Sequence, residues 1–207
     1  NWTPDGRHLA VVRPVGMVNQ LELLDATGAE PPIKLAAAAG LDQMAFRPPD
    51  GREILFRANV GGNYGLFVMN ADGSDLRIVG HNYRNSYEQS ITSLGDIFQS
   101  DNDDPPAART AWLMEYGNLG FASRNGKRNW GSDKIPGQTT QVAEWRQEDP
   151  GVVPAGDVYG GGSPTGIAIY ENGIMEKQFG GYVISCEPAR NTLFGYHPKA
   201  EGAGITL

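Results

Sequence analysis

The first 80 residues repeat at a spacing of 45, and this period constrains the fold more than any other feature of the sequence. Pro4-Asp5-Gly6-Arg7 recurs as Pro49-Asp50-Gly51-Arg52, and Leu24-Asp25-Ala26-Thr27-Gly28 recurs as Met69-Asn70-Ala71-Asp72-Gly73. A weaker third copy, residues 93–98, follows about one period later. Two landmarks at one offset indicate a structural unit that occurs more than once. Periods of roughly 20–50 residues are typical of propellers, solenoids and arrays.

Each period contains short alternating runs, such as residues 52–56 and 65–69, separated by Asp-Gly or Thr-Gly pairs. Asp-Gly supplies the positive φ of tight hairpin turns, and the runs have the length and residue types of strands. Roughly four strands in 40–45 residues is the size of a propeller blade, so a β-propeller is favoured over a sandwich. The sequence therefore predicts an all-β propeller segment of about four four-stranded antiparallel blades. Only residues 34–41, with four alanines, are expected to be briefly helical before Gly40 ends the helix.

Residues 1–80 resemble two blades of TolB-like (WD40-like) propellers. The resemblance rests on residues 2–7, residues 46–52 and the run Met69-Asn70-Ala71-Asp72-Gly73-Ser74. It concerns the architecture of the blade and implies no chemistry. We accordingly interpret Asp5, Asp50 and Asp72 as turn residues.

Composition excludes several classes of function. A net charge of −7 and a pI near 4.9 argue against nucleic acid or an anionic membrane surface as the main partner. There is no run of 18 apolar residues and no signal-peptide pattern at the start, where the chain is expected to begin inside a folded unit. The single Cys186 rules out an internal disulfide framework and a cysteine-based metal site, and is interpreted as a packed thiol.

Polar residues gather around one strand in the second half of the chain. Residues 81–89 and 101–105 contain several amide and acidic side chains and one arginine. They lie before and after the strand-like run 96–100. From His81 onward the sequence resembles the sorbosone/aldose dehydrogenase-type quinoprotein propellers, most closely the large dehydrogenase-like proteins of planctomycete-type bacteria. The motifs that carry this resemblance are residues 83–89, 99–104, 114–121 and 162–170.

The resemblance implies pyrroloquinoline quinone (PQQ) and calcium as cofactors. By position in the family's motifs, the residues it implies for the quinone are Arg84, Asn85, Gln99, Asn118 and, less strongly, Arg190, and those for calcium are Asp101, Asn102, Asp103 and Asp104. The residue types suit this chemistry, because an arginine fork pairs with carboxylates and a hard cation on oxygen ligands polarises a quinone.

Structural interpretations of the same residues stay open. Arg84 can instead bridge neighbouring blades, and residues 101–104 can form a solvated turn before Pro105-Pro106. The loop is not an EF-hand, since Pro106 stands where that pattern needs glycine. Ser86-Tyr87 and Leu119 depart from the family's motifs. No catalytic base is identified, and we interpret His81 and His197 as structural.

We expect two parts in the chain. Residues 1–80 are predicted to form two TolB-like blades, and residues 81–207 are predicted to form quinoprotein-like blades with an insertion at about 118–157. We expect that insertion to build a funnel where substrate is met. About four blades, against six in the dehydrogenase relatives, suggest an incomplete ring, and the boundary at 80/81 is either natural divergence or an artificial junction.

Two functions follow as hypotheses. The first is a fragment of a periplasmic or extracellular dehydrogenase that oxidises a sugar or alcohol with PQQ and calcium, partnered by the remaining blades or an appended cytochrome domain. The alternative is a non-catalytic propeller scaffold that binds a protein or a cell-envelope glycan.

Overall fold

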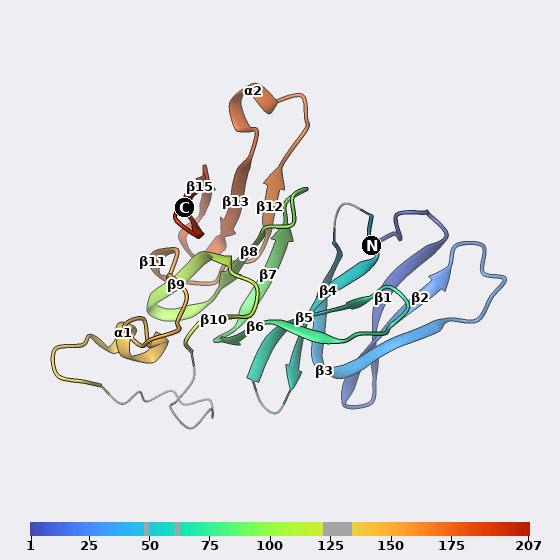
Figure 1. Cartoon of the computed structure of the whole chain (residues 1–207), viewed down its shortest axis with the longest axis horizontal. Helices are drawn as coiled ribbons and strands as arrows, with labels where there is room; N and C mark the ends of the chain where they lie inside the picture. Colours follow the sequence, from blue (N-terminus) through green and yellow to red (C-terminus); the bar gives the residue numbers. More distant parts are fainter. Residues whose placement is uncertain (48–49, 61–62, 122–133) are drawn as a thin grey trace.

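Antiparallel strands make up most of the molecule (Figure 1), which confirms the all-β prediction. The structure is a computed structural model that describes residues 1–207 except 48–49, 61–62 and 122–133, and it leaves the side chains of residues 43, 60, 63 and 104–106 undescribed. None of the helices in this described part is long and apolar enough to span a bilayer.

The N-terminal half forms one sheet made of two joined units. Its strands, in the order in which they pair, are β1 (His8–Val15), β2 (Val18–Asp25), β3 (Ile33–Phe46), β4 (Glu53–Val60), β5 (Asn63–Asn70), β6 (Arg77–Tyr83) and β10 (Gly117–Asn118). Neighbours are antiparallel except for the two-residue pairing of β10 with β6. Residues 33–38 of β3 pair with β2, and residues 39–46 pair with β4. We call β1, β2 and residues 33–38 unit I, and residues 39–46 with β4, β5 and β6 unit II.

The repeat of 45 residues is visible in the strand boundaries. β1 and β4 begin at His8 and Glu53, and β2 and β5 begin at Val18 and Asn63, so both pairs keep the offset. Unit II has four strands as predicted, whereas unit I has three strands and a bridge between Trp2 and Leu9.

Turn acids close the hairpins of both units. Asp5 and Asp50 each accept a hydrogen bond from the backbone amide two residues further on, at 3.0 and 3.1 Å. Asp72 accepts one from the Ser74 amide at 2.9 Å. These contacts confirm that the three acids are turn residues, as their position directly before glycine predicts.

The helix expected within residues 34–41 is wrong, because this segment is part of β3. Its backbone pairs with β2 and then with β4, and Leu35, Ala36 and Ala38 pack against the apolar cluster between units I and II. Pairing and packing on both sides outweigh the weak helical preference of alanine.

Two further units follow. Unit III is a four-stranded sheet of β7 (Ser86–Ile91), β8 (Ile97–Asp101), β9 (Asp103–Leu113) and β11 (Asp157–Gly162). Unit IV contains β12 (Ile167–Tyr170), β13 (Tyr182–Glu187) and β14 (Thr192–Tyr196). The remaining elements are α1 (Thr140–Trp145), α2 (Glu176–Phe179), the 3-10 turn η1 (Pro188–Arg190) and the hairpin β15 (Lys199–Glu201) and β16 (Gly204–Thr206). β6 crosses the 80/81 position, so the two proposed domains share that strand.

The units stack face to face through apolar clusters, side by side in Figure 1. Units I and II share a cluster that contains Leu21 and Ile54, units II and III one with Leu66 and Trp145, and units III and IV one centred on Phe98. β7 contacts both β3 and β12, so the first strands of successive units lie next to one another. This is the packing of propeller blades.

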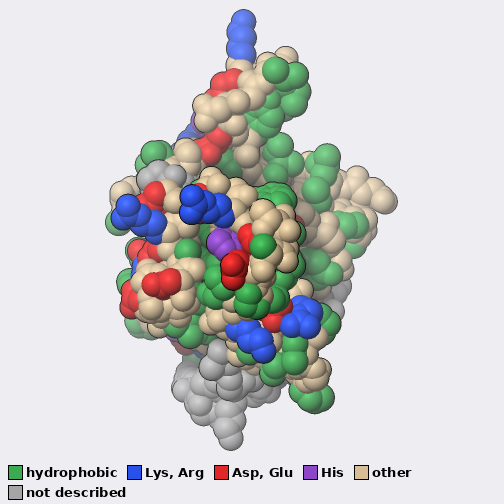
Figure 2. All heavy atoms as spheres, turned by 90° about the vertical axis from the view of Figure 1, so that its right-hand side faces the viewer, with side chains coloured by type: hydrophobic (Ala, Val, Ile, Leu, Met, Phe, Trp, Pro, Cys, Tyr) green, Lys and Arg blue, Asp and Glu red, His purple; other side chains and the backbone are tan. Residues whose placement is uncertain are grey.

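One face of the molecule carries charges of both signs. Figure 2 shows the face beside the N-terminal units, where lysine and arginine side chains are interspersed with acidic and hydrophobic ones. On the described part of that face no continuous basic area is present.

Candidate functional site

The turn between β6 and β7 lies against the end of β8. The register that pairs Ser86 with Asp101 brings these segments together. The Asp101 carboxylate accepts hydrogen bonds from the backbone amides of Arg84 and Asn85, at 3.1 and 2.7 Å. Burial raises the pKa of Asp101 to about 7, while the two amides and the charges of Arg109 and Arg84 oppose that rise. Asp101 therefore holds the turn in place.

The Arg84 side chain points back into the same group. Its Nη1 donates to the carbonyl and the Oδ1 of Asn102, at 3.1 and 2.8 Å, and its Nε lies 2.9 Å from Asp103 Oδ1. Asn85 Nδ2 donates to the same Asn102 Oδ1 at 2.9 Å. The structure thus brings together five of the residues predicted for the quinone and the metal, although Arg84 is only 3% exposed. We call them the Arg84 group: Arg84, Asn85, Asp101, Asn102 and Asp103.

The group continues into helix α1 through residues that the sequence did not single out. Asp103 Oδ2 accepts from Trp145 Nε1 at 2.8 Å. The Arg109 guanidinium lies 3.6 Å from the centre of the Trp145 ring and donates to the Ala107 carbonyl and to Gln147 Oε1. Burial lowers the pKa of Arg109 to about 10, against the attraction of Asp101 and Asp103. Arg109 lies near Asp101 because the two residues are paired between β8 and β9. This pairing is the one feature that could have predicted the contact.

Buried polar atoms without partners lie beside this group. Gln99 is fully buried, and neither its Nε2 nor its Oε1 has a hydrogen-bond partner among the described residues. The same holds for Ser86 Oγ and for the Tyr83 hydroxyl, whose pKa is raised by burial and by the Asp101 charge. Such atoms in a buried site are commonly satisfied by ordered water.

Other predicted residues lie in different contacts. Asn118 Oδ1 accepts from Asn82 Nδ2 and from the Gly120 amide, both at 2.9 Å, and so stabilises the turn after β10. Arg190 is exposed and donates to the Tyr159 carbonyl at the edge of β11. The Asp104 side chain lies outside the described residues. Within the described part, no group of three or more His, Cys, Asp or Glu side chains is placed to hold a metal ion.

Neither histidine considered earlier joins the Arg84 group through a described contact. His81 is half-buried, which lowers its pKa, and its carbonyl accepts from the Leu119 amide at 3.0 Å. His197 lies edge-on to Tyr182, with ring centres 5.4 Å apart. These contacts identify neither His81 nor His197 as a catalytic base.

Within the described part of the 118–157 insertion, α1 packs on the core through Ala143 and Trp145. Thr139 caps α1 by accepting from the Val142 amide at 3.3 Å, and Trp145 is fully buried with its ring 5.0 Å from that of Phe121. Residues 122–133 of the predicted funnel lie outside the described residues. A funnel over the channel stays a prediction.

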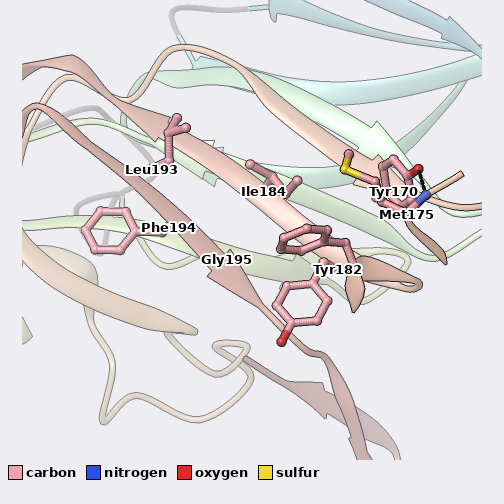
Figure 3. A pocket seen from close by; sticks show the side chains of 8 residues that line it. Tyr170, Met175, Tyr182, Ile184, Leu193, Phe194 and Gly195 are labelled. Atoms are coloured by element: carbon pink, nitrogen blue, oxygen red, sulfur yellow. Dashed lines mark hydrogen bonds between the residues drawn. The ribbon is translucent and has the colours of Figure 1, made fainter. Parts of the chain in front are cut away.

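An apolar pocket of about 330 Å³ lies apart from these residues, on unit IV. Figure 3 shows Tyr170, Tyr182, Ile184 and Leu193 on its sheet, and a hydrogen bond of 2.8 Å from the Met175 amide to the Tyr170 hydroxyl shapes one side. Its lining contains no charged side chain. The pocket therefore does not suit a cofactor that carries carboxylates.

Comparison with solved structures shows that the fold of the chain is similar to that of sugar dehydrogenases. A glucose dehydrogenase matches over 100% of this chain and 70% of its own, with 12% identity and a TM-score of 0.67. The soluble aldose sugar dehydrogenase from Escherichia coli, in its apo form, matches over 99% and 69%, with 12% identity and a TM-score of 0.63. The PQQ-bound aldose sugar dehydrogenase from Streptomyces coelicolor matches over 98% and 62%, with 13% identity and a TM-score of 0.62.

These neighbours confirm the predicted propeller segment and, at the level of fold, the resemblance to glucose and aldose dehydrogenases. No protein-family model and no curated protein matches the sequence. TolB from Acinetobacter baumannii matches with 16% identity and a TM-score of 0.42, which is too low to support an argument about residues 1–80.

The Arg84 group does not fit PQQ or calcium in the arrangement observed. A carboxylate of the quinone would need guanidinium nitrogens that are buried and already face Asn102 and Asp103. A calcium ion would need carboxylate oxygens, yet those of Asp101 and Asp103 accept N–H donors of the chain and are almost inaccessible. The observed geometry therefore gives these residues no role in a chemical step.

Proposed function

We propose that this chain is a propeller segment of a dehydrogenase that oxidises a sugar or an alcohol, with PQQ and calcium as cofactors and a periplasmic or extracellular location. The similarity in fold to glucose and aldose sugar dehydrogenases supports the proposal, because it extends over 97–100% of the chain. When bound, PQQ would accept the electrons of the oxidised substrate. Gln99, Asn118 and Arg190 stay predicted contacts of the cofactor.

Titration of the purified chain with PQQ, with and without calcium, tests the proposal. We expect saturable binding, followed by the absorbance of the quinone and by calorimetry, and dye reduction with at least one aldose or alcohol. Arg190→Gln should weaken binding about tenfold, the effect of losing about 1.4 kcal/mol.

Arg52→Gln provides the matched control. Arg52 is also an exposed arginine, 85% accessible and paired only at the surface with Asp50, so its replacement should leave PQQ binding unchanged. Absence of saturable PQQ binding under both conditions would contradict the dehydrogenase proposal.

A specific observation favours a second candidate, a non-catalytic scaffold. The charged groups of Arg84, Asp101 and Asp103 are buried and paired within the chain, as in a structural network. A scaffold would bind a protein or a cell-envelope glycan on one face and leave PQQ unbound. Co-sedimentation with purified cell-envelope polysaccharide, together with the PQQ titration, separates the two candidates.

A further inference from the structure

The Asp103 carboxylate connects two segments that are distant in sequence. Its Oδ1 lies 2.9 Å from Arg84 Nε, and its Oδ2 accepts from Trp145 Nε1, 42 residues further on. The side chains of Arg84 and Asp103 are 4% and 5% exposed. The buried carboxylate forms an ion pair with the Arg84 guanidinium and accepts a hydrogen bond from the Trp145 indole. Separating it from either partner would leave an uncompensated buried group, so this contact fixes the two segments in place.

Trp145 is held on its other sides as well. Arg109 covers one face of the ring at 3.6 Å, and Phe121 lies 5.0 Å away. Arg109 is itself fixed by the Ala107 carbonyl and by Gln147, which donates to the Val153 carbonyl at 3.1 Å. The Trp145 ring thus fixes the start of the segment 145–153 against unit III, and Gln147 links Arg109 of unit III to Val153 at its end.

Close backbone packing shows how little freedom this joint leaves. At Gly120, whose φ is +88°, an added Cβ would lie 2.0 Å from the Trp145 carbonyl oxygen and 2.9 Å from Val152 Cγ1. The chain near the start of the insertion thus passes directly against the last residue of α1. Only a residue without a side chain fits this crossing.

We infer that Asp103 is a structural residue that holds α1 and the β6–β7 turn against unit III. The charged groups around it stabilise the fold and bind neither calcium nor a quinone. The inference goes beyond the proposed function and stands whether or not PQQ binds elsewhere on the chain. It predicts that this group stabilises the protein without any cofactor.

Asp103→Asn tests it, since the amide keeps the shape of the carboxylate but presents a donor to Arg84 or to Trp145. We expect a fall in melting temperature of about 10 °C, since breaking a buried pair has a large cost. Limited proteolysis should show cleavage within residues 134–157 at least tenfold faster. Asp75→Asn is the matched control, because Asp75 pairs with Arg77 at the surface and is 66% exposed. It should change neither quantity.

Trp145→Phe keeps the inference testable if Asp103→Asn does not fold. It keeps an aromatic ring but removes the Nε1–H donor together with part of the fully buried indole. We therefore expect a fall of at least about 3 °C and faster cleavage in the same segment. Unchanged melting and cleavage in both variants would overturn the inference.

Melting in the presence of calcium or PQQ tests the alternative, that the group around Asp103 binds one of these ligands. Millimolar calcium or PQQ should shift the melting temperature of the wild type and of the folded variants equally. A rise in the wild type that Asp103→Asn or Trp145→Phe abolishes would show that this group binds the ligand, and would overturn the inference. The PQQ titration of the Arg190→Gln variant tests the proposed function separately. If that titration contradicts the proposed function, the melting and proteolysis results still test the role of Asp103.

Discussion

Glu88 links two units through a single carboxylate. It lies on β7, and its Oε2 accepts from the Ile167 amide of unit IV at 3.2 Å. Burial raises the pKa of Glu88, and the Ile167 hydrogen bond opposes the rise. Because the folded pKa lies above the unfolded one, stability is greatest below the unfolded pKa and is lost as pH rises through the folded pKa.

Glu88→Gln should therefore flatten the dependence of melting temperature on pH above about pH 4.5. Because glutamine does not ionise, the cost of burying it does not change with pH. We therefore expect the melting temperature of the variant to rise by about 1 °C relative to the wild type between pH 4 and pH 7. Melting curves across that range measure it. Glu201→Gln, at an exposed position on β15, should follow the wild type, and a parallel profile for Glu88→Gln would contradict the argument.

Local rules identified some residues and missed others. Asp5 and Asp50 were predicted as turn residues because an acid before glycine bonds its own backbone two residues on. The convergence of Arg84 with Asp103 followed from motifs at two strand ends. Trp145 joins them across 42 residues, and no local pattern encodes a contact of that separation.

At the level of elements, the two equivalent turns at Gly6 and Gly51 offer a matched test. Their φ values are +67° and +64°, but an added Cβ at Gly51 would lie 2.0 Å from Pro4 Cγ, whereas nothing lies within 4 Å of one at Gly6. Gly6→Ala should cost about 1–2 kcal/mol, the strain of an alanine at positive φ. Gly51→Ala should cost about 1–3 kcal/mol more, because it also crowds Pro4.

Urea unfolding of both variants measures the difference in the free energy of unfolding. Equal losses would mean that Pro4 moves aside and that the contact between the turns of units I and II is soft. A larger loss at Gly51 would show that the repeated turns are coupled.

β3 shows why one element was predicted wrongly. Its alanines favour a helix locally, but the strand continues through Gly40, whose φ is +58°, as its pairing passes from Ala38 with Asn19 to Ala39 with Asn59. The glycine permits the change of partner between two units and ends no helix. Sequence pattern predicted the turns on either side, while the shared strand depended on the stacking of units I and II.

For the molecule as a whole, the regular period describes units I and II and weakens beyond them. β11 pairs with β9 after the long 118–157 segment, and the faces of unit III carry buried Gln99 and Ser100 in place of apolar residues. The number of units was nevertheless predictable, because 207 residues hold about four repeats of 45 once the insertion is allowed for. The polar contacts between units III and IV were not, because they depend on which strand faces lie opposite one another.

Separate apolar clusters between neighbouring units predict that damage stays local. Phe98 is 1% exposed and packs with Ile167 and Val183 between units III and IV, and Ile54 is fully buried between units I and II. Phe98→Ala should cost about 3–5 kcal/mol and Ile54→Ala about 2–5 kcal/mol. Because each unit contacts mainly its neighbours, hydrogen exchange measured by mass spectrometry should accelerate in β12–β14 for Phe98→Ala and in β1–β2 for Ile54→Ala. Uniform acceleration across all strands in either variant would show instead that the stacked units unfold as one cooperative body.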